Sequence, residues 1–165
     1  PGRSADAQLA ARLFAEVAGG GSASRLFQEV REERGLAYSV GAGLHPHAEL
    51  SLFYVHAATA RRDAASAAGL IEAVLEETAA TLTQRELDRV HTQARAGLAM
   101  QLETPWGQAS YAARQLAVHG RLIEPAEVIA ALARLSVDEV RAAGQHILAG
   151  ERAAATIGVP AARAA

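Results

Sequence analysis

Residues 19–40, GGGSASRLFQEVREERGLAYSV, combine three consecutive glycines, a charged amphipathic stretch and a β-like run that contains a tyrosine. In the amphipathic stretch Leu26, Phe27 and Val30 lie at helical spacing, and Gly35 stands where a helix would end. The residues after Gly35 favour a strand. The segment therefore predicts a turn, a short helix and a strand, and it separates two differently built parts of the chain.

A helix is predicted before this segment, and a hairpin is predicted after it. Apolar side chains recur at helical spacing over residues 4–18, and the three glycines end that pattern. Residues 36–44 and 50–59 are rich in β-branched and aromatic side chains, and a polar stretch with a proline lies between them. We expect these two runs to pair as antiparallel strands.

The rest of the chain is predicted to be helical almost to its end. Thr83 with Glu86, and Ser136 with Glu139, have the spacing of capping boxes, which start helices. Pro105 ends one helix, and Pro125 stands at a favoured first-turn position of another. The expected helices cover residues 62–80, 83–103, 106–120, 125–135 and 136–148. The expected final strand covers residues 153–159.

This order of elements predicts an α+β fold, a two-layer sandwich in which helices pack on one face of an antiparallel sheet. Residues 1–165 form a single expected domain, which is a usual size for one core. Three strands are few for so many helices, and the chain opens on a Pro-Gly pair directly before a helix. We therefore expect the sheet to lack its first strand, the chain to be part of a larger polypeptide, and the open edge to favour a homodimer.

Composition excludes several classes of function. The chain has no cysteine, so disulfides and thiolate metal sites are excluded. A net charge of −2 predicts neither a nucleic-acid partner nor an anionic membrane partner. No apolar run approaches the length of a membrane span, and no signal peptide is recognisable. These features predict a soluble protein of the cytoplasm.

The segment of residues 19–40 resembles the glycine-rich and RGLAY region of the pitrilysin and mitochondrial-processing-peptidase family of zinc metallopeptidases. The stretch LTQRELDRVHTQARAGLAMQLETP and the closing SVDEVRAAGQHIL also resemble that family, in the same order. Members are built from homologous α+β half-units, and the resemblance is to the C-terminal half-unit, which carries no zinc. It implies a half that closes a proteolytic chamber and clamps a peptide or unfolded protein substrate.

The zinc-binding motif HxxEH is absent from this sequence. None of the six histidines has a second histidine four residues on, and that spacing is what places two imidazoles on one helical face. We expect no metal or other cofactor in this chain, and zinc in the complementary half-unit, in cis or in trans. The run HPHAE, with His45, His47 and Glu49, is interpreted as a solvated loop in preference to a metal site.

Arg31 and Tyr38 match an arginine and a tyrosine that reach toward the substrate in the family. A guanidinium can donate two hydrogen bonds to a peptide carbonyl, and a phenol can donate to the oxyanion of amide hydrolysis. The resemblance therefore implies that Tyr38 is catalytic and that Arg31 holds the substrate backbone. The alternative is an arginine on a solvated helix face and an ordinary strand tyrosine.

Gly19, Gly20 and Gly21 have two interpretations. They can supply the left-handed turn between two helices, or they can form a flexible rim that contacts bound peptide, as the resemblance implies. A nucleotide site is disfavoured because the chain has no lysine, no GxxxxGK[ST] motif and a helix in place of the preceding strand.

Two functions follow. In the first, the chain is the C-terminal half of an active zinc endopeptidase and is inactive alone because it lacks HxxEH. In the second, it belongs to a non-catalytic structural or partner-binding subunit of the same family. The presence of both Arg31 and Tyr38 favours the first.

Overall fold

The computed structural model describes residues 5–46 and 51–158. Its elements follow the predicted order of two helices, a hairpin and a series of helices. They are α1 (Ala5–Gly19), η1 (Phe27–Glu33), β1 (Ser39–Pro46), β2 (Ser51–Ala58), η2 (Arg61–Asp63), α2 (Ala64–Thr81), α3 (Gln84–Leu102), α4 (Pro105–His119), α5 (Pro125–Ala133) and α6 (Val137–Leu148).

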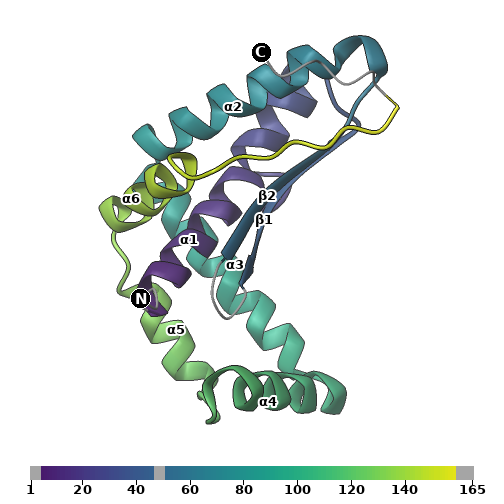
Figure 1. Cartoon of the computed structure of the whole chain (residues 1–165). Helices are drawn as coiled ribbons and strands as arrows, with labels where there is room; N and C mark the ends of the chain where they lie inside the picture. Colours follow the sequence, from purple (N-terminus) through teal and green to yellow (C-terminus); the bar gives the residue numbers. More distant parts are fainter. Residues whose placement is uncertain (1–4, 47–50, 159–165) are drawn as a thin grey trace.

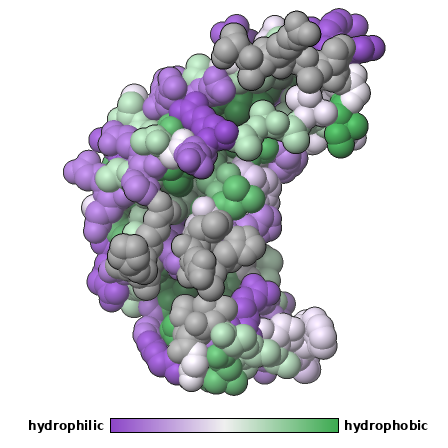
Figure 2. Space-filling view, in the orientation of Figure 1, coloured by the Kyte–Doolittle hydropathy of each residue, from purple (hydrophilic) through white to green (hydrophobic). Residues whose placement is uncertain are grey.

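Strands β1 and β2 pair antiparallel, from Ser39 opposite Ala58 to Pro46 opposite Ser51. Helices α1 and α2 lie on one face of this hairpin, and α6 packs against both of them (Figure 1). The α+β class, and the packing of helices on one face of an antiparallel sheet, are therefore confirmed. The molecule is a crescent, with the hairpin along its concave side and α4 at the lower end (Figures 1 and 2).

A third strand was predicted at residues 153–159. The prediction is wrong for residues 153–158, which form no strand, and residue 159 lies outside the described residues. The segment and β2 both line a groove of about 1020 Å³, together with residues of α2 and the end of α6. A strand requires a partner about 4.8 Å away. Across this groove no pairing joins the segment to β2, so its strand-like composition is not realised.

Short-range signals predicted the helix starts well. Thr83 and Ser136 each close a capping box with the glutamate three residues on. Pro105 and Pro125 occupy the first turns of α4 and α5, where the missing N–H of proline removes no helical hydrogen bond. Among the described residues, no helix has the length and apolar character that crossing a bilayer requires.

The buried side chains form two clusters that meet at the sheet. One joins α1, α3 and α6 through Phe14, Leu87 and Val140. The other joins η1 and α2 through Val30 and Val74. Phe53 of β2 packs against both clusters, and its ring centroid lies 5.9 Å from that of Phe14. The hairpin is thus held on the helix layer by apolar contacts with both clusters.

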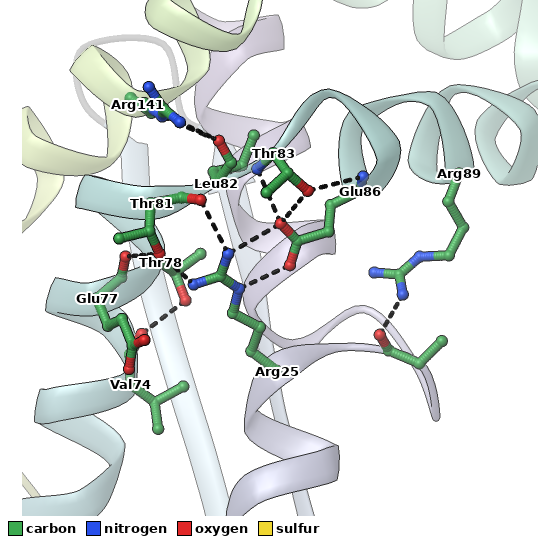
Figure 3. Close-up of polar contacts among 11 residues, drawn as sticks. Arg25, Val74, Glu77, Thr78, Thr81, Leu82, Thr83, Glu86, Arg89 and Arg141 are labelled. Carbon is green, nitrogen blue, oxygen red and sulfur yellow. Dashed lines mark hydrogen bonds and ion pairs between the residues drawn. The ribbon is translucent and has the colours of Figure 1, made fainter.

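A polar contact ties the start of η1 to the junction of α2 and α3 (Figure 3). Arg25 donates from Nε to Glu86 Oε1 at 2.7 Å and from Nη2 to Glu86 Oε2 at 2.8 Å. Its Nη1 donates to Thr81 Oγ1 at 2.8 Å, and Glu86 also accepts from the Thr83 N–H at 2.8 Å. One carboxylate therefore caps α3 and binds the arginine that precedes η1.

This pair lowers the pKa of Glu86. Burial by itself would raise that pKa, but hydrogen bonds from the Arg25 guanidinium and from Thr83 outweigh it and bring the pKa to about 2. The same contact with Glu86 raises the pKa of Arg25. Both side chains are mostly buried, at 16% and 19% exposed, so water screens the ion pair only in part.

We predict that Gly144→Ala destabilises the fold. A Cβ at residue 144 would lie 2.5 Å from Phe14 Cε2, so α6 and α1 would have to separate. Overpacking of this kind costs about 1–3 kcal/mol, which exceeds the roughly 1 kcal/mol that alanine gains over glycine in a helix. Urea unfolding measures the difference. Gly97→Ala, in α3 with open space around the new Cβ, is the control and should stabilise slightly. Equal stability of the two variants would contradict the close contact.

We also predict an acid-dependent contribution from Glu86. The folded pKa of Glu86 lies below the usual value of 4.5 for a glutamate, so the stabilisation is complete above pH 4.5 and disappears as pH falls toward about 2. Glu86→Gln should therefore lower the free energy of unfolding by about 1–2 kcal/mol near neutral pH, a discounted figure because the pair is partly solvated. The difference from wild type should shrink in acid, as measured by urea unfolding at several pH values.

Glu29→Gln is the control for that experiment. Burial and the neighbouring Glu77 and Glu33 carboxylates raise the pKa of Glu29, so its charge opposes folding near neutral pH. Its neutralisation should act in the opposite direction, with a small stabilisation near pH 7 that is lost in acid. The same sign for both variants would show that the acid dependence does not come from these local contacts.

Candidate functional site

Arg31 and Tyr38, the two site residues expected from the sequence, lie together in the structure. The Arg31 Cζ atom is 4.6 Å from the centroid of the Phe27 ring and 5.8 Å from that of the Tyr38 ring. Both distances allow cation–π attraction. The Tyr38 side chain is 84% exposed. A cation and a phenol are thus presented side by side at the surface.

The turn between η1 and β1 produces this arrangement. Gly35 has a φ of +60°, a left-handed conformation that glycine adopts without strain. The chain then reverses, and the Leu36 N–H donates to the Val30 carbonyl at 2.9 Å. The Tyr38 N–H donates to the Ala58 carbonyl at 2.8 Å, which fixes the tyrosine at the start of the sheet. Helix end, glycine turn and strand start therefore bring the two side chains to one place.

The helix that carries Arg31 is a π-helix, a difference from the ordinary helix that its apolar spacing suggested. The Arg34 N–H donates to the Glu29 carbonyl at 3.2 Å, five residues back. Leu26 and Val30 are fully buried beneath it. Apolar spacing could not reveal this geometry, because a short π segment and an α-helix bury a similar face. Segments of this kind are frequent at functional sites.

The charge of Arg31 remains available for a ligand. Its Nε lies 3.5 Å from Glu32 Oε1, in a pair whose side chains are 39% and 52% exposed. Exposed pairs of this kind contribute little, typically about 0–1 kcal/mol. Within the described residues the Arg31 guanidinium donates no hydrogen bond that would compete with a substrate carbonyl.

The three glycines of the turn have different surroundings. A Cβ at Gly19 would clash with the Ala42 backbone nitrogen, and one at Gly20 would lie 2.7 Å from the Glu16 Cα. Gly21 has a φ of +156° and open space around it. Close packing therefore explains the first two glycines, and neither of them has the positive φ of a left-handed turn. Contact of Gly21 with a peptide stays a prediction.

Metal ligands do not gather in the described part of the chain. No group of three or more His, Asp or Glu side chains there could hold a metal ion. His45 stacks on Tyr54, with ring centroids 4.7 Å apart, while His47 and Glu49 lie outside the described residues. The interpretation of HPHAE as a solvated loop therefore stays a prediction.

Sequence reasoning missed two features of this site. Phe27 was assigned to the apolar face of a helix, although its spacing of four residues from Arg31 is one at which helical side chains meet. The contact between Arg25 and Glu86 joins residues 61 apart, and no local pattern announces such a pair.

Comparisons with known proteins identify relatives along the chain. Residues 1–94 of the 165 match the family model described as the peptidase M16 inactive domain. An uncharacterized zinc protease of Mycobacterium bovis is 33% identical over 159 residues, which cover 96% of this chain and 36% of that protein. The chain spans 31–36% of the length of the curated relatives it matches.

Solved structures share the fold. A protease from Helicobacter pylori has a TM-score of 0.76 at 22% identity, over 88% of this chain and 35% of that one. The peptidase M16 inactive domain from Pseudomonas fluorescens has a TM-score of 0.67 at 26% identity, over 82% of this chain and 33% of that one.

These matches confirm the resemblance inferred from the glycine-rich and RGLAY segment. The relatives carry the name of zinc proteases, and the matched domain is the one described as inactive. Because the family model covers more than half of its residues, the chain belongs to the family of peptidase M16 inactive domains.

Proposed function

We propose that this chain is the substrate-clamping, chamber-closing half of a zinc-dependent endopeptidase. It supplies Arg31 and Tyr38 to an active site whose zinc lies on another half-unit. The observation that carries this proposal is the exposed pair itself, with the Arg31 guanidinium 5.8 Å from the Tyr38 ring. The concave side of the crescent, bordered by the hairpin and α4, has a shape suited to closing over a second body (Figure 2).

Arg31 binds the backbone of the substrate in this proposal. Its planar guanidinium can donate two parallel hydrogen bonds to a peptide carbonyl or a carboxylate. The Phe27 ring at 4.6 Å supports the cation from one side and limits the rotamers that it can adopt. Less side-chain entropy is then lost when a peptide binds.

Tyr38 stabilises charge in the proposed reaction. When water adds to a peptide carbonyl, the oxygen becomes an oxyanion, and the phenol O–H can donate a hydrogen bond to it. At 84% exposed, Tyr38 can reach a substrate held against a facing half-unit. Removal of water when the two halves close would strengthen this bond.

Zinc is assigned to the complementary half-unit. The described residues of this chain form no cluster of metal ligands, and the sequence has no HxxEH. The relatives named as zinc proteases are longer than this chain, so the complementary half can lie on the same polypeptide or on a partner subunit. The substrate would be a peptide or an unfolded protein, clamped between the halves.

A non-catalytic, partner-binding subunit is the alternative. Such a subunit could bind its partner through exposed apolar side chains of α4, where Trp106 is 81% exposed and Leu116 is 55% exposed. A partner that covers α4 is compatible with either function, and enzyme assays on the site residues separate the two.

Tyr38→Phe should lower turnover by about 10²-fold in the complete enzyme, because only the hydroxyl donor is lost. Arg31→Ala should also raise KM, since it removes the side chain that binds the substrate backbone. The assay is steady-state cleavage of a quenched-fluorescent peptide by the full-length protein or the reconstituted pair of halves, with zinc content measured for each variant.

Arg34→Ala is the matched control for those variants. Arg34 follows η1 directly and is exposed, but it contacts neither Phe27 nor Tyr38 through its guanidinium in the described structure. Its removal should change kcat and KM by less than about threefold, because exposed charges contribute little. Cleavage at the wild-type rate by Tyr38→Phe would overturn the assignment of the tyrosine.

The purified chain should bind no zinc stoichiometrically and should cleave no peptide. The missing pair of imidazoles on one helical face is the reason. Metal analysis after dialysis and a peptide-cleavage assay with and without a chelator are the measurements. Retained zinc, or cleavage that the chelator abolishes, would place the catalytic metal on this chain and contradict the proposal.

A further inference from the structure

The π-helix η1 is attached to α3 by two arginine contacts at its start (Figure 3). Arg25 binds Glu86 through two hydrogen bonds, and Arg89 donates to the carbonyl of Ala23. Glu86 and Arg89 are three residues apart in α3, so one helical face holds the whole segment that leads into η1. Arg31 lies six residues beyond Arg25.

Apolar burial sets which face of η1 turns to the core, but it fixes the rotation about the helix axis only roughly. Leu26 and Val30 are fully buried and hold the helix against the core, but the hydrophobic effect has no preferred direction. The Arg25 contact is directional. Its planar guanidinium meets both carboxylate oxygens of Glu86, at 2.7 and 2.8 Å, and a third bond reaches Thr81 Oγ1 at 2.8 Å.

The rotation of η1 matters because it sets where the Arg31 side chain lies. A π-helix bonds each N–H to a carbonyl five residues back and an α-helix to one four residues back, so the two place side chains differently about the axis. A shift from π to α bonding between Arg25 and Arg31 would turn the Arg31 side chain about the helix axis. It would then leave the position over the Phe27 and Tyr38 rings.

We propose that the Arg25–Glu86 ion pair is a positioning device, which holds the start of η1 on α3 so that Arg31 is presented beside Tyr38. The proposal rests on the proposed role of Arg31 in substrate binding. Neither Arg25 nor Glu86 contacts the substrate in this account; both act through the orientation of Arg31.

The test uses the full-length protease and two variants of the pair. Glu86→Gln removes the charge, and Arg25→Lys keeps the charge but removes the planar fork. Each variant should raise KM by about tenfold, the scale expected when a positioning contact is lost, while kcat stays within about threefold. If Glu86→Gln does not fold, Arg25→Lys still tests the proposal.

Glu127→Gln is the matched control. Glu127 also accepts two hydrogen bonds from one arginine, Arg121, at 2.7 and 3.2 Å, but that pair lies between α4 and α5 and not beside η1. Its loss should leave KM unchanged. A rise in KM as large as that of Glu86→Gln would show a general effect of removing an ion pair and would overturn the proposal.

A double-mutant cycle separates positioning from stability. If the pair acts through Arg31, then Glu86→Gln should raise KM no further in the Arg31→Ala background. A lower Tm is expected in either case, because the pair also stabilises the fold. An unchanged KM below the melting range, or a change in KM that is additive with Arg31→Ala, would overturn the proposal.

The variant Arg31→Ala tests the proposed function separately. If it leaves KM unchanged, Arg31 does not bind substrate, and the proposed function fails. Amide hydrogen exchange then decides whether the pair positions the helix. Exchange over residues 27–33 should be faster in Glu86→Gln, with α6 unchanged, and unchanged exchange in η1 would show that the pair does not hold it.

Discussion

The side chain of Phe14 connects helix α1 with the hairpin and with helix α6. Its ring is fully buried, lies 5.9 Å from the ring of Phe53 in β2, and contacts the bare backbone of Gly144 in α6. A two-stranded hairpin is at best marginally stable alone in water. Here it becomes part of a folded domain because apolar contacts with both clusters hold it on the helix layer, and Phe14 also connects it to the last helix. The exposed tyrosine at the start of β1 is positioned by that packing.

The candidate site lies on the second, smaller cluster of buried side chains, and polar contacts also hold its helix in place. Leu26 and Val30 bury one side of η1, while the arginine at its start is held by a glutamate 61 residues further on. The glutamate also caps α3, so one partly buried carboxylate binds two elements at once. The two-fold hydrogen bonding from the arginine gives this contact a direction that apolar packing lacks.

Local chemistry explains what the sequence could predict. The capping boxes at Thr83 and Ser136, and the glycine turn at Gly35, each depend on neighbours within a few residues, and each was found where it was expected. The adjacency of Arg31 and Tyr38 followed from the same turn. The third strand was not realised, because a strand exists only with a partner and no pattern within residues 153–158 states whether one is near. The π-helix and the Arg25–Glu86 contact were missed because both depend on distant packing.

The packing of the first helix against the last has a consequence for biosynthesis. Phe14 is synthesised before the Gly144 surface that covers it, which emerges about 130 residues later, and ribosomes add roughly 5–20 residues per second. For several seconds the apolar face of α1 is exposed to chaperones and to other nascent chains. The hairpin, whose contacts are local, can form during that interval, whereas closure of the core must follow synthesis of α6. Folding of this unit is therefore expected to finish only after α6 has left the ribosome.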